Sequence, residues 1–140
     1  MRILGIDFGE KRIGLAISDP LGILATPIET LDSSEMDLVI PKLAETISDH
    51  TVTKIVVGIP WTLSGKSGPQ TKKTFEFISL ISDTFEIPIK QIDERFTSLQ
   101  AEKKLRLVDK RSRKKQKKIP KGLIDSVSAA IILQTYLDTK

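Results

Sequence analysis

The chain contains no cysteine, which excludes disulfide bonds and thiolate metal sites. It also lacks any apolar run that approaches the roughly 18 residues of a membrane span. Asp7 follows so soon after the short apolar start that residues 1–7 are not expected to act as a signal peptide. The single histidine, His50, is expected at a helix end rather than in a metal site. These absences favour a cytoplasmic protein without a membrane partner.

The composition is typical of a globular protein, because 39% of the residues are hydrophobic. A length of 140 residues fits a single domain, residues 1–140, with a core of ordinary size. No internal repeat and no shift in composition indicates a domain boundary. The sequence therefore predicts one compact unit.

The positive charge is concentrated in one segment. Residues 103–121 hold 11 of the 22 lysines and arginines and a single acid, so this segment carries +10 and the rest of the chain −6. A basic stripe on a mildly acidic body suggests a polyanionic partner. The alternative is a solvated loop whose charge only aids solubility. We favour a nucleic-acid partner, because the stripe lies between Glu94 and Asp125 in the sequence.

The spacing of apolar residues predicts elements in the order βββαβαβαα. The expected strands cover 2–8, 12–19, 22–30, 54–59 and 87–93, and the expected helices cover 35–49, 69–85, 97–107 and 122–138. Ser33 or Ser34 is a candidate cap for the first helix, and Pro41 could kink it. An antiparallel hairpin unit followed by alternating strands and helices predicts an α/β fold with a mixed central sheet and helices on both faces.

Carboxylates stand at the ends of three predicted elements. Asp7 ends the first strand, Asp93 and Glu94 end the last one, and Asp125 opens the final helix. Adjacent strand residues point to opposite faces, so only one of Asp93 and Glu94 can readily face Asp7. Each position also has an ordinary structural explanation: a cap on the Gly9 turn, a solvated strand end, and a helix start favoured by the helix dipole.

Three acids that converge at the ends of buried elements repel one another unless cations neutralise them. Oxygen ligands suit Mg²⁺ or Mn²⁺, and two such ions can stabilise both the attacking and the leaving oxygen in phosphodiester cleavage. The sequence therefore predicts a two-ion site in which Asp7, Glu94 and Asp125 are both the metal ligands and the catalytic residues.

Several cations could bind the phosphates of a nucleic acid. The candidates are Lys11 and Arg12 after the Gly9 turn, Arg95 beside Glu94, and Lys114, Lys115, Lys117 and Lys118 in the basic stripe. Trp61, in the glycine-containing loop after the fourth strand, could stack on a base or pack on the domain.

Four motifs in order resemble one family over essentially all 140 residues: Gly5-Ile6-Asp7-Phe8-Gly9-Glu10-Lys11-Arg12-Ile13-Gly14, Val56-Val57-Gly58-Ile59-Pro60 with Gly65 and Gly68, Asp93-Glu94-Arg95-Phe96-Thr97-Ser98, and Ile124-Asp125-Ser126 with Ala129-Ala130. The chain resembles the YqgF family, whose members are named pre-16S rRNA nucleases and described as Holliday-junction-resolvase-like. The resemblance implies a ribonuclease-H-like fold and places Asp7, Glu94 and Asp125 on the three acidic active-site positions. It further implies processing of the 5′ end of 16S rRNA. The loop Trp61-Thr62-Leu63-Ser64 departs from the leucine and asparagine usual there.

Three other functions remain open at this point. A DNA junction resolvase needs a dimer with two active sites, whereas this chain is expected to be a monomer or a weak homodimer. A non-catalytic nucleic-acid-binding factor in transcription or ribosome assembly does not need all three acids. The segment around Asp7 also resembles the first phosphate loop of actin-like sugar kinases and chaperones, but those need two such domains. The expected partner is therefore structured RNA, namely precursor 16S rRNA, or branched DNA.

Overall fold

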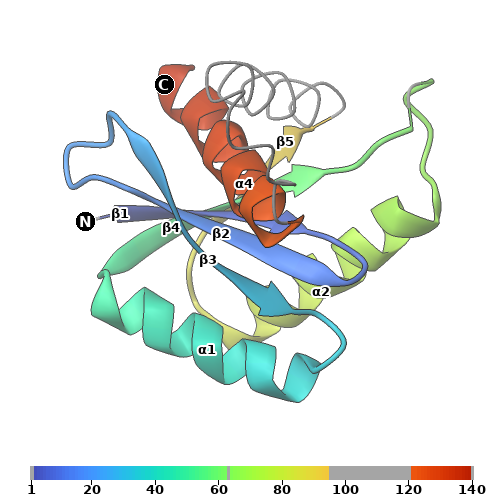
Figure 1. Ribbon diagram of the computed structural model, residues 1–140, viewed down its shortest axis with the longest axis horizontal. Helices are drawn as coiled ribbons and strands as arrows, with labels where there is room; N and C mark the ends of the chain where they lie inside the picture. The colour runs from blue at the N-terminus through green and yellow to red at the C-terminus, as the bar shows by residue number, and fades with distance from the viewer. Residues whose placement is uncertain (1, 63, 95–120, 140) are drawn as a thin grey trace, which may run out of the picture.

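The computed structural model describes residues 2–62, 64–94 and 121–139. A five-stranded mixed sheet forms its centre, in the order β3-β2-β1-β4-β5 (Figure 1). The strands are β1 Arg2–Phe8, β2 Arg12–Ser18, β3 Ala25–Asp32, β4 Val52–Ile59 and β5 Ile89–Asp93. β1, β2 and β3 pair antiparallel in succession, whereas β4 runs parallel to both β1 and β5. The predicted α/β mixed sheet is thereby confirmed.

Helices cover both faces of this sheet (Figure 1). They are α1 Met36–Asp49, α2 Pro69–Thr84 and α4 Lys121–Asp138. α1 and α2 lie on one face and α4 crosses the other. The predicted helix over 97–107 lies outside the described residues. No helix in the described part of the chain is long and apolar enough to cross a membrane.

The alternation of side chains along β1 separates the core from the site. Leu4, Ile6 and Phe8 belong to the larger hydrophobic cluster beneath α1 and α2. Ile3 belongs to the second cluster, which packs under α4, and Asp7 shares its face because residues two apart in a strand point the same way. The strand therefore anchors itself with one face and presents a carboxylate on the other.

Two local predictions, the start of the third strand and the cap of the first helix, were wrong. The third strand begins at Ala25 rather than residue 22, because the Asp19 carboxylate accepts bonds from the backbone N–H groups of Ile23 and Leu24, at 2.7 and 2.8 Å, and closes a loop. Neither Ser33 nor Ser34 caps α1, whose N-cap is Glu35. α1 continues through Pro41 to its predicted end.

Candidate active site at the carboxyl ends of the parallel strands

Asp7 stands near the carboxyl end of β1, on the face that α4 covers. In the register of the hairpin it lies opposite Gly14 of β2. On its other side is β4, in which Val57 pairs with the residue before Asp7. The side chain is partly buried. A carboxylate in this place is surrounded by strands on two sides and by a helix above.

Glu94 comes close to Asp7 across β4, because it extends β5, the parallel strand on the far side of β4. Its backbone N–H donates to the Ile59 carbonyl at 3.1 Å, one step beyond the end of β5. Its side chain is buried, with 8% of the residue exposed, and it forms a hydrogen bond with the Asp7 carboxyl group. Asp93, by contrast, is exposed. Of the two adjacent acids, it is therefore Glu94 that faces Asp7.

Gly58 of β4 provides the space in which these two carboxyl groups meet. A Cβ atom at this position would lie 2.6 Å from Glu94 Oε2, and it would also collide with Ile132 of α4. Any side chain here would push the Glu94 carboxyl group away. The absence of a side chain on the strand between β1 and β5 therefore allows their acids to approach each other.

Asp125 approaches from above on α4. The sequence placed it in the first turn, but α4 already includes Lys121, so Asp125 lies beyond the first turn and the dipole argument loses most of its force. The backbone carbonyl of Asp125 rests directly on Gly14, where a Cβ atom would overlap it. Gly14 is the residue opposite Asp7 in the hairpin. The same glycine therefore brings the backbone of the third acid down toward the first.

The Asp125 carboxylate is held by an ion pair with Arg12 of β2. Arg12 Nε donates to Asp125 Oδ2 at 3.0 Å. Both side chains are partly open to solvent, with 35% of Arg12 and 28% of Asp125 exposed. The negative charge of Asp125 is still close enough to Asp7 to raise the pKa of Asp7.

Burial next to other acids raises the pKa values of both Asp7 and Glu94. Burial, followed by the charge of Asp7 and the hydrogen bond between the two groups, raises the pKa of Glu94 to about 9. Burial raises the pKa of Asp7 to about 6, although the hydrogen bond from Glu94 opposes this rise. Near neutral pH the pair therefore shares one proton, with protonated Glu94 donating to ionised Asp7.

The donor set of this pair fits a hard divalent cation. Both ligands offer carboxylate oxygens, which suit Mg²⁺ or Mn²⁺, and a cation would replace the shared proton and remove the repulsion. Among residues 2–62, 64–94 and 125–139, however, no three acidic or histidine side chains lie close enough together to hold one ion. The structure thus brings two of the three predicted ligands together and holds Asp125 beside them on Arg12.

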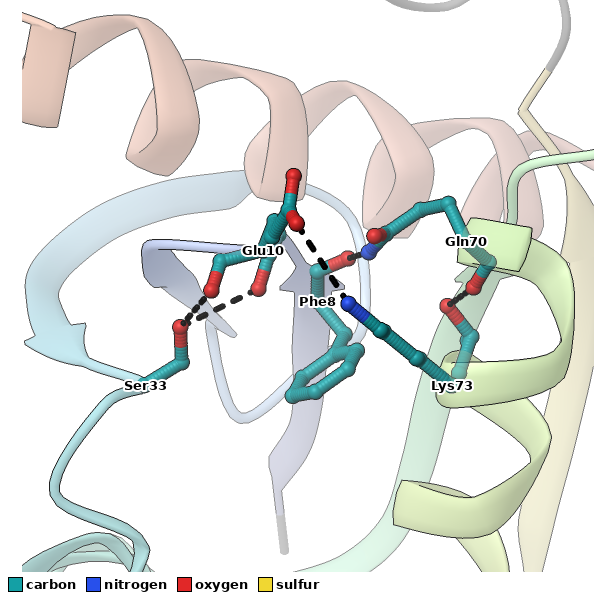
Figure 2. A network of polar contacts seen from close by, with 7 residues as sticks. Phe8, Glu10, Ser33, Gln70 and Lys73 are labelled. Carbon is teal, nitrogen blue, oxygen red and sulfur yellow. Dashed lines mark hydrogen bonds and ion pairs between the residues drawn. The ribbon is translucent and has the colours of Figure 1, made fainter.

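The loop between β1 and β2 is fixed by polar contacts on the side away from α4 (Figure 2). Gln70 Nε2 donates to the Phe8 carbonyl at 3.0 Å, and Lys73 Nζ pairs with Glu10 Oε1 at 3.4 Å. The Ser33 hydroxyl donates to the Gly9 and Glu10 carbonyls at 3.2 and 2.8 Å. These contacts tie the turn that follows Asp7 to α2 and to the end of β3.

The predicted nucleic-acid ligands have different positions. Lys11 is exposed on the loop after β1, and Arg12 follows it as the partner of Asp125. Arg95, Lys114, Lys115, Lys117 and Lys118 lie outside the described residues. Trp61 packs edge-to-face on Phe75 of α2, with the ring centroids 5.8 Å apart, so of its two predicted roles the structure shows packing on the domain.

The family model described as "RuvX: Holliday junction resolvase" matches residues 1–139 of the chain. The chain belongs to the RuvX family. Relatives named "Putative pre-16S rRNA nuclease" include those of Ruminiclostridium cellulolyticum (42% identity, 99% of this chain, 94% of the relative) and Bacillus subtilis strain 168 (41% identity, 99% of both). A relative of the same name from Sulfurihydrogenibium sp. is 47% identical, over 98% of this chain and 90% of the relative. The resemblance drawn from the motifs is thereby confirmed.

Solved structures share the fold of this RuvX chain at low sequence identity. Thermus thermophilus RuvC in complex with a Holliday junction substrate superimposes with a TM-score of 0.61 at 14% identity, over 99% of this chain and 96% of that one. The fowlpox virus resolvase in complex with Holliday junction DNA gives a TM-score of 0.57, also at 14% identity, over 99% and 98%. These likenesses show a resolvase-like fold.

Sequence reasoning missed two features of the RuvX site. The roles of Gly14 and Gly58 as contact points were not predicted, although both fall on strands whose neighbours carry the acids. The ion pair between Arg12 and Asp125 was missed as well, because 113 residues separate the partners and no local pattern links them. Only the combination of hairpin register and helix placement could have revealed it.

Proposed function

We propose that this chain is a metal-dependent endonuclease that hydrolyses phosphodiester bonds in structured RNA, with precursor 16S rRNA as its substrate. Membership of the RuvX family and the names of its relatives support the reaction and the substrate. The observation that carries the proposal is the pairing of partly buried Asp7 with buried Glu94 at the carboxyl ends of two parallel strands. Two acids that share one proton form a site in which a divalent cation can replace that proton.

In this proposal Asp7 and Glu94 hold the first Mg²⁺ or Mn²⁺ ion, and Asp125 completes a second position. When bound, the ions activate a water molecule and stabilise the leaving 3′ oxygen. Glu94 must lose its proton before it can serve as a ligand, and Gly58 leaves room for its carboxylate to turn toward Asp7. Because Glu94 is buried between strands and α4, it is held in one orientation before substrate arrives.

The substrate backbone is proposed to follow the positive charges around this site. Lys11 and Arg12 lie on and beside the loop that follows Asp7, and Arg95 directly follows Glu94 in the sequence. Lys114, Lys115, Lys117 and Lys118 would add further phosphate contacts from the basic stripe. A ribosomal RNA precursor as substrate implies a cytoplasmic protein, because that RNA is transcribed and processed in the bacterial cytoplasm.

A second candidate is resolution of four-way DNA junctions. The description of the family model and the junction DNA in two structures of similar fold favour it. A resolvase must cut two strands symmetrically and therefore needs two active sites, whereas we propose a monomer or a weak homodimer. Sedimentation at several concentrations, with and without junction DNA, separates these expectations.

The decisive experiment offers both substrates to the purified protein. Precursor 16S rRNA and a four-way DNA junction are incubated with Mg²⁺, with Mn²⁺ and with a chelator. We expect endonucleolytic products from the RNA in the presence of metal. Products from the junction alone would transfer the proposal to DNA. Binding of either polymer without cleavage under any condition would indicate the non-catalytic factor instead.

A further inference from the structure

Arg12 has two possible partners in the proposed reaction, the Asp125 carboxylate and a substrate phosphate. It is paired with Asp125 through Nε at 3.0 Å, and it stands next to the loop that carries exposed Lys11. The bond to Asp125 runs through Nε, so the two terminal nitrogens can make the first contact with a phosphate, toward which guanidinium has its fork geometry. Both members of the pair are partly solvent-exposed, so a phosphate group can reach the arginine without unfolding anything.

The pair also determines what Asp125 can do. The backbone of Asp125 is fixed on Gly14, opposite Asp7, so only its side chain can turn. That side chain is bonded to Arg12, and among the described residues Asp7, Glu94 and Asp125 do not form a group close enough to hold one ion. With Arg12 in place, the site offers two carboxyl groups rather than three.

We propose that Arg12 is a positioning residue that withholds Asp125 from the metal site until a substrate phosphate displaces it. In the free protein the guanidinium group neutralises Asp125. When the nucleic-acid backbone arrives, Arg12 exchanges the carboxylate for a phosphate, and Asp125 is released to complete the second metal position. This inference rests on the proposed function, because it concerns the same carboxylates, and it adds that substrate binding assembles the site.

A withholding role for Arg12 predicts a direction of change in Mn²⁺ affinity that other roles of Arg12 do not predict. If Arg12 withholds Asp125, Arg12→Gln should bind Mn²⁺ more tightly than the wild type in the absence of nucleic acid. If Arg12 instead orients Asp125 for the metal, the same change should weaken Mn²⁺ binding. A purely structural role would leave Mn²⁺ affinity unchanged and lower only the melting temperature.

The first assay measures Mn²⁺ affinity by calorimetry for the wild type, Arg12→Gln, Asp125→Asn and the double variant. We expect Arg12→Gln to tighten binding roughly three- to tenfold, the range of a partly exposed ion pair plus the removal of a nearby like charge. In the Asp125→Asn background the same change should have a much smaller effect. Lys90→Gln is the matched control, because it removes an equal charge from an exposed residue outside the proposed site.

The second assay measures binding of a short RNA stem-loop to the same four proteins in a chelator. We expect Asp125→Asn to bind the RNA several-fold more tightly than the wild type, because Arg12 no longer has to leave its partner. This gain should be absent when Arg12 is already Gln. An equal gain in both backgrounds would show simple repulsion between Asp125 and phosphate, and would overturn the inference.

The two failures are distinguishable. Weaker or unchanged Mn²⁺ binding by Arg12→Gln, in a protein whose Mn²⁺ binding is abolished by Asp7→Asn, overturns the role of Arg12 and leaves the metal site intact. Mn²⁺ binding that is absent, or indifferent to Asp7→Asn, overturns the proposed function and this inference together. Circular dichroism melting of each variant verifies that it is folded.

Discussion

At the scale of single residues, the central fact is that Glu94 is buried against another acid. A carboxyl group in that position is tolerated because it is neutral and donates its proton to Asp7. The arrangement is stable only while one proton, or a cation in its place, lies between the two groups. The pair is therefore expected to make stability depend on pH, and to make cleavage depend on metal.

Asp7→Asn should reduce metal-dependent cleavage by at least about a hundredfold, equivalent to roughly 2.7 kcal/mol of transition-state stabilisation. The substitution keeps the volume of the side chain and removes its charge, so the metal site suffers more than the packing. Cleavage rates and melting curves measure the two effects separately. Asp93→Asn is the control, because Asp93 is the exposed neighbour of Glu94 and should retain the wild-type rate. A normal rate for Asp7→Asn would contradict its assignment as a metal ligand.

The metal-free protein should lose stability as the pH rises. The folded pKa values of Asp7 and Glu94, about 6 and about 9, lie above the ordinary values of 3.8 and 4.5, so the folded state binds more protons than the unfolded state. Their contribution to stability is complete below about pH 4 and is lost as the pH rises through about 6 and then about 9. Urea unfolding in a chelator from pH 5 to pH 9 measures this loss.

The matched variant for this titration is Glu94→Gln. Its amide can donate to Asp7 as protonated Glu94 does, but it cannot ionise. We expect it to be more stable than the wild type at pH 9 without metal, and to have a shallower pH dependence. If both proteins show the same slope over this range, the shared proton does not govern stability.

At the scale of elements, the position of α4 is determined by the residues beneath it. Gly14 and Gly58 let the helix approach β2 and β4 closely, and this approach carries Asp125 to the carboxyl ends of the strands. The pattern of apolar residues predicted the sheet and its two covered faces, because successive side chains of a strand point to opposite faces of the sheet. The start of β3 was predicted wrongly, because local bonds such as those of Asp19 leave no mark on periodicity.

Gly14→Ala should destabilise the protein by about 1–3 kcal/mol, the usual cost of overpacking. The added methyl group would overlap the backbone carbonyl of Asp125, which cannot rotate away as a side chain can. Because the clash displaces Asp125, cleavage should fall further than stability alone explains. Chemical unfolding and cleavage assays below the unfolding transition measure both. Gly68→Ala is the control, since its methyl group would meet only the Thr62 side chain, at 3.2 Å; equal effects of the two changes would contradict the special role of Gly14.

At the scale of the whole molecule, metal binding is expected to change the stability of the entire fold, and the distribution of charge is expected to determine where a polyanion binds. Acids at the ends of strands and a basic stripe were both visible in the sequence. Strand register determines which of the two adjacent acids faces Asp7. The pairing of Asp125 with Arg12 depends on a contact between residues 113 positions apart. Such long-range partners arise only once the chain has folded, so a single sequence could propose the set of site residues but not their pairing.

Divalent metal should stabilise the folded protein as a whole. An ion that binds only the native state adds RT ln(1 + [L]/Kd), about 2.7 kcal/mol at a hundredfold excess over Kd. The Asp7→Asn, Glu94→Gln double variant should lose this stabilisation, and it should melt higher than the wild type in a chelator at pH 9. Melting curves over a Mn²⁺ series provide the comparison. An unchanged response to Mn²⁺ in the double variant would place the binding site elsewhere.

Changing Lys114, Lys115, Lys117 and Lys118 to Gln should weaken RNA binding and flatten its salt dependence. The segment from residue 103 to 121 carries +10 against −6 for the rest of the chain, so the partner's phosphates are expected to meet it first. Each lost phosphate contact should reduce the slope of log K against log salt by roughly 0.7–0.9. Filter binding across a salt series measures the slope. Lys114→Gln with Lys115→Gln is compared with Lys42→Gln and Lys90→Gln, two exposed lysines elsewhere that remove the same charge. If both double variants change the slope equally, RNA responds to net charge alone, and the basic stripe holds no defined phosphate contacts.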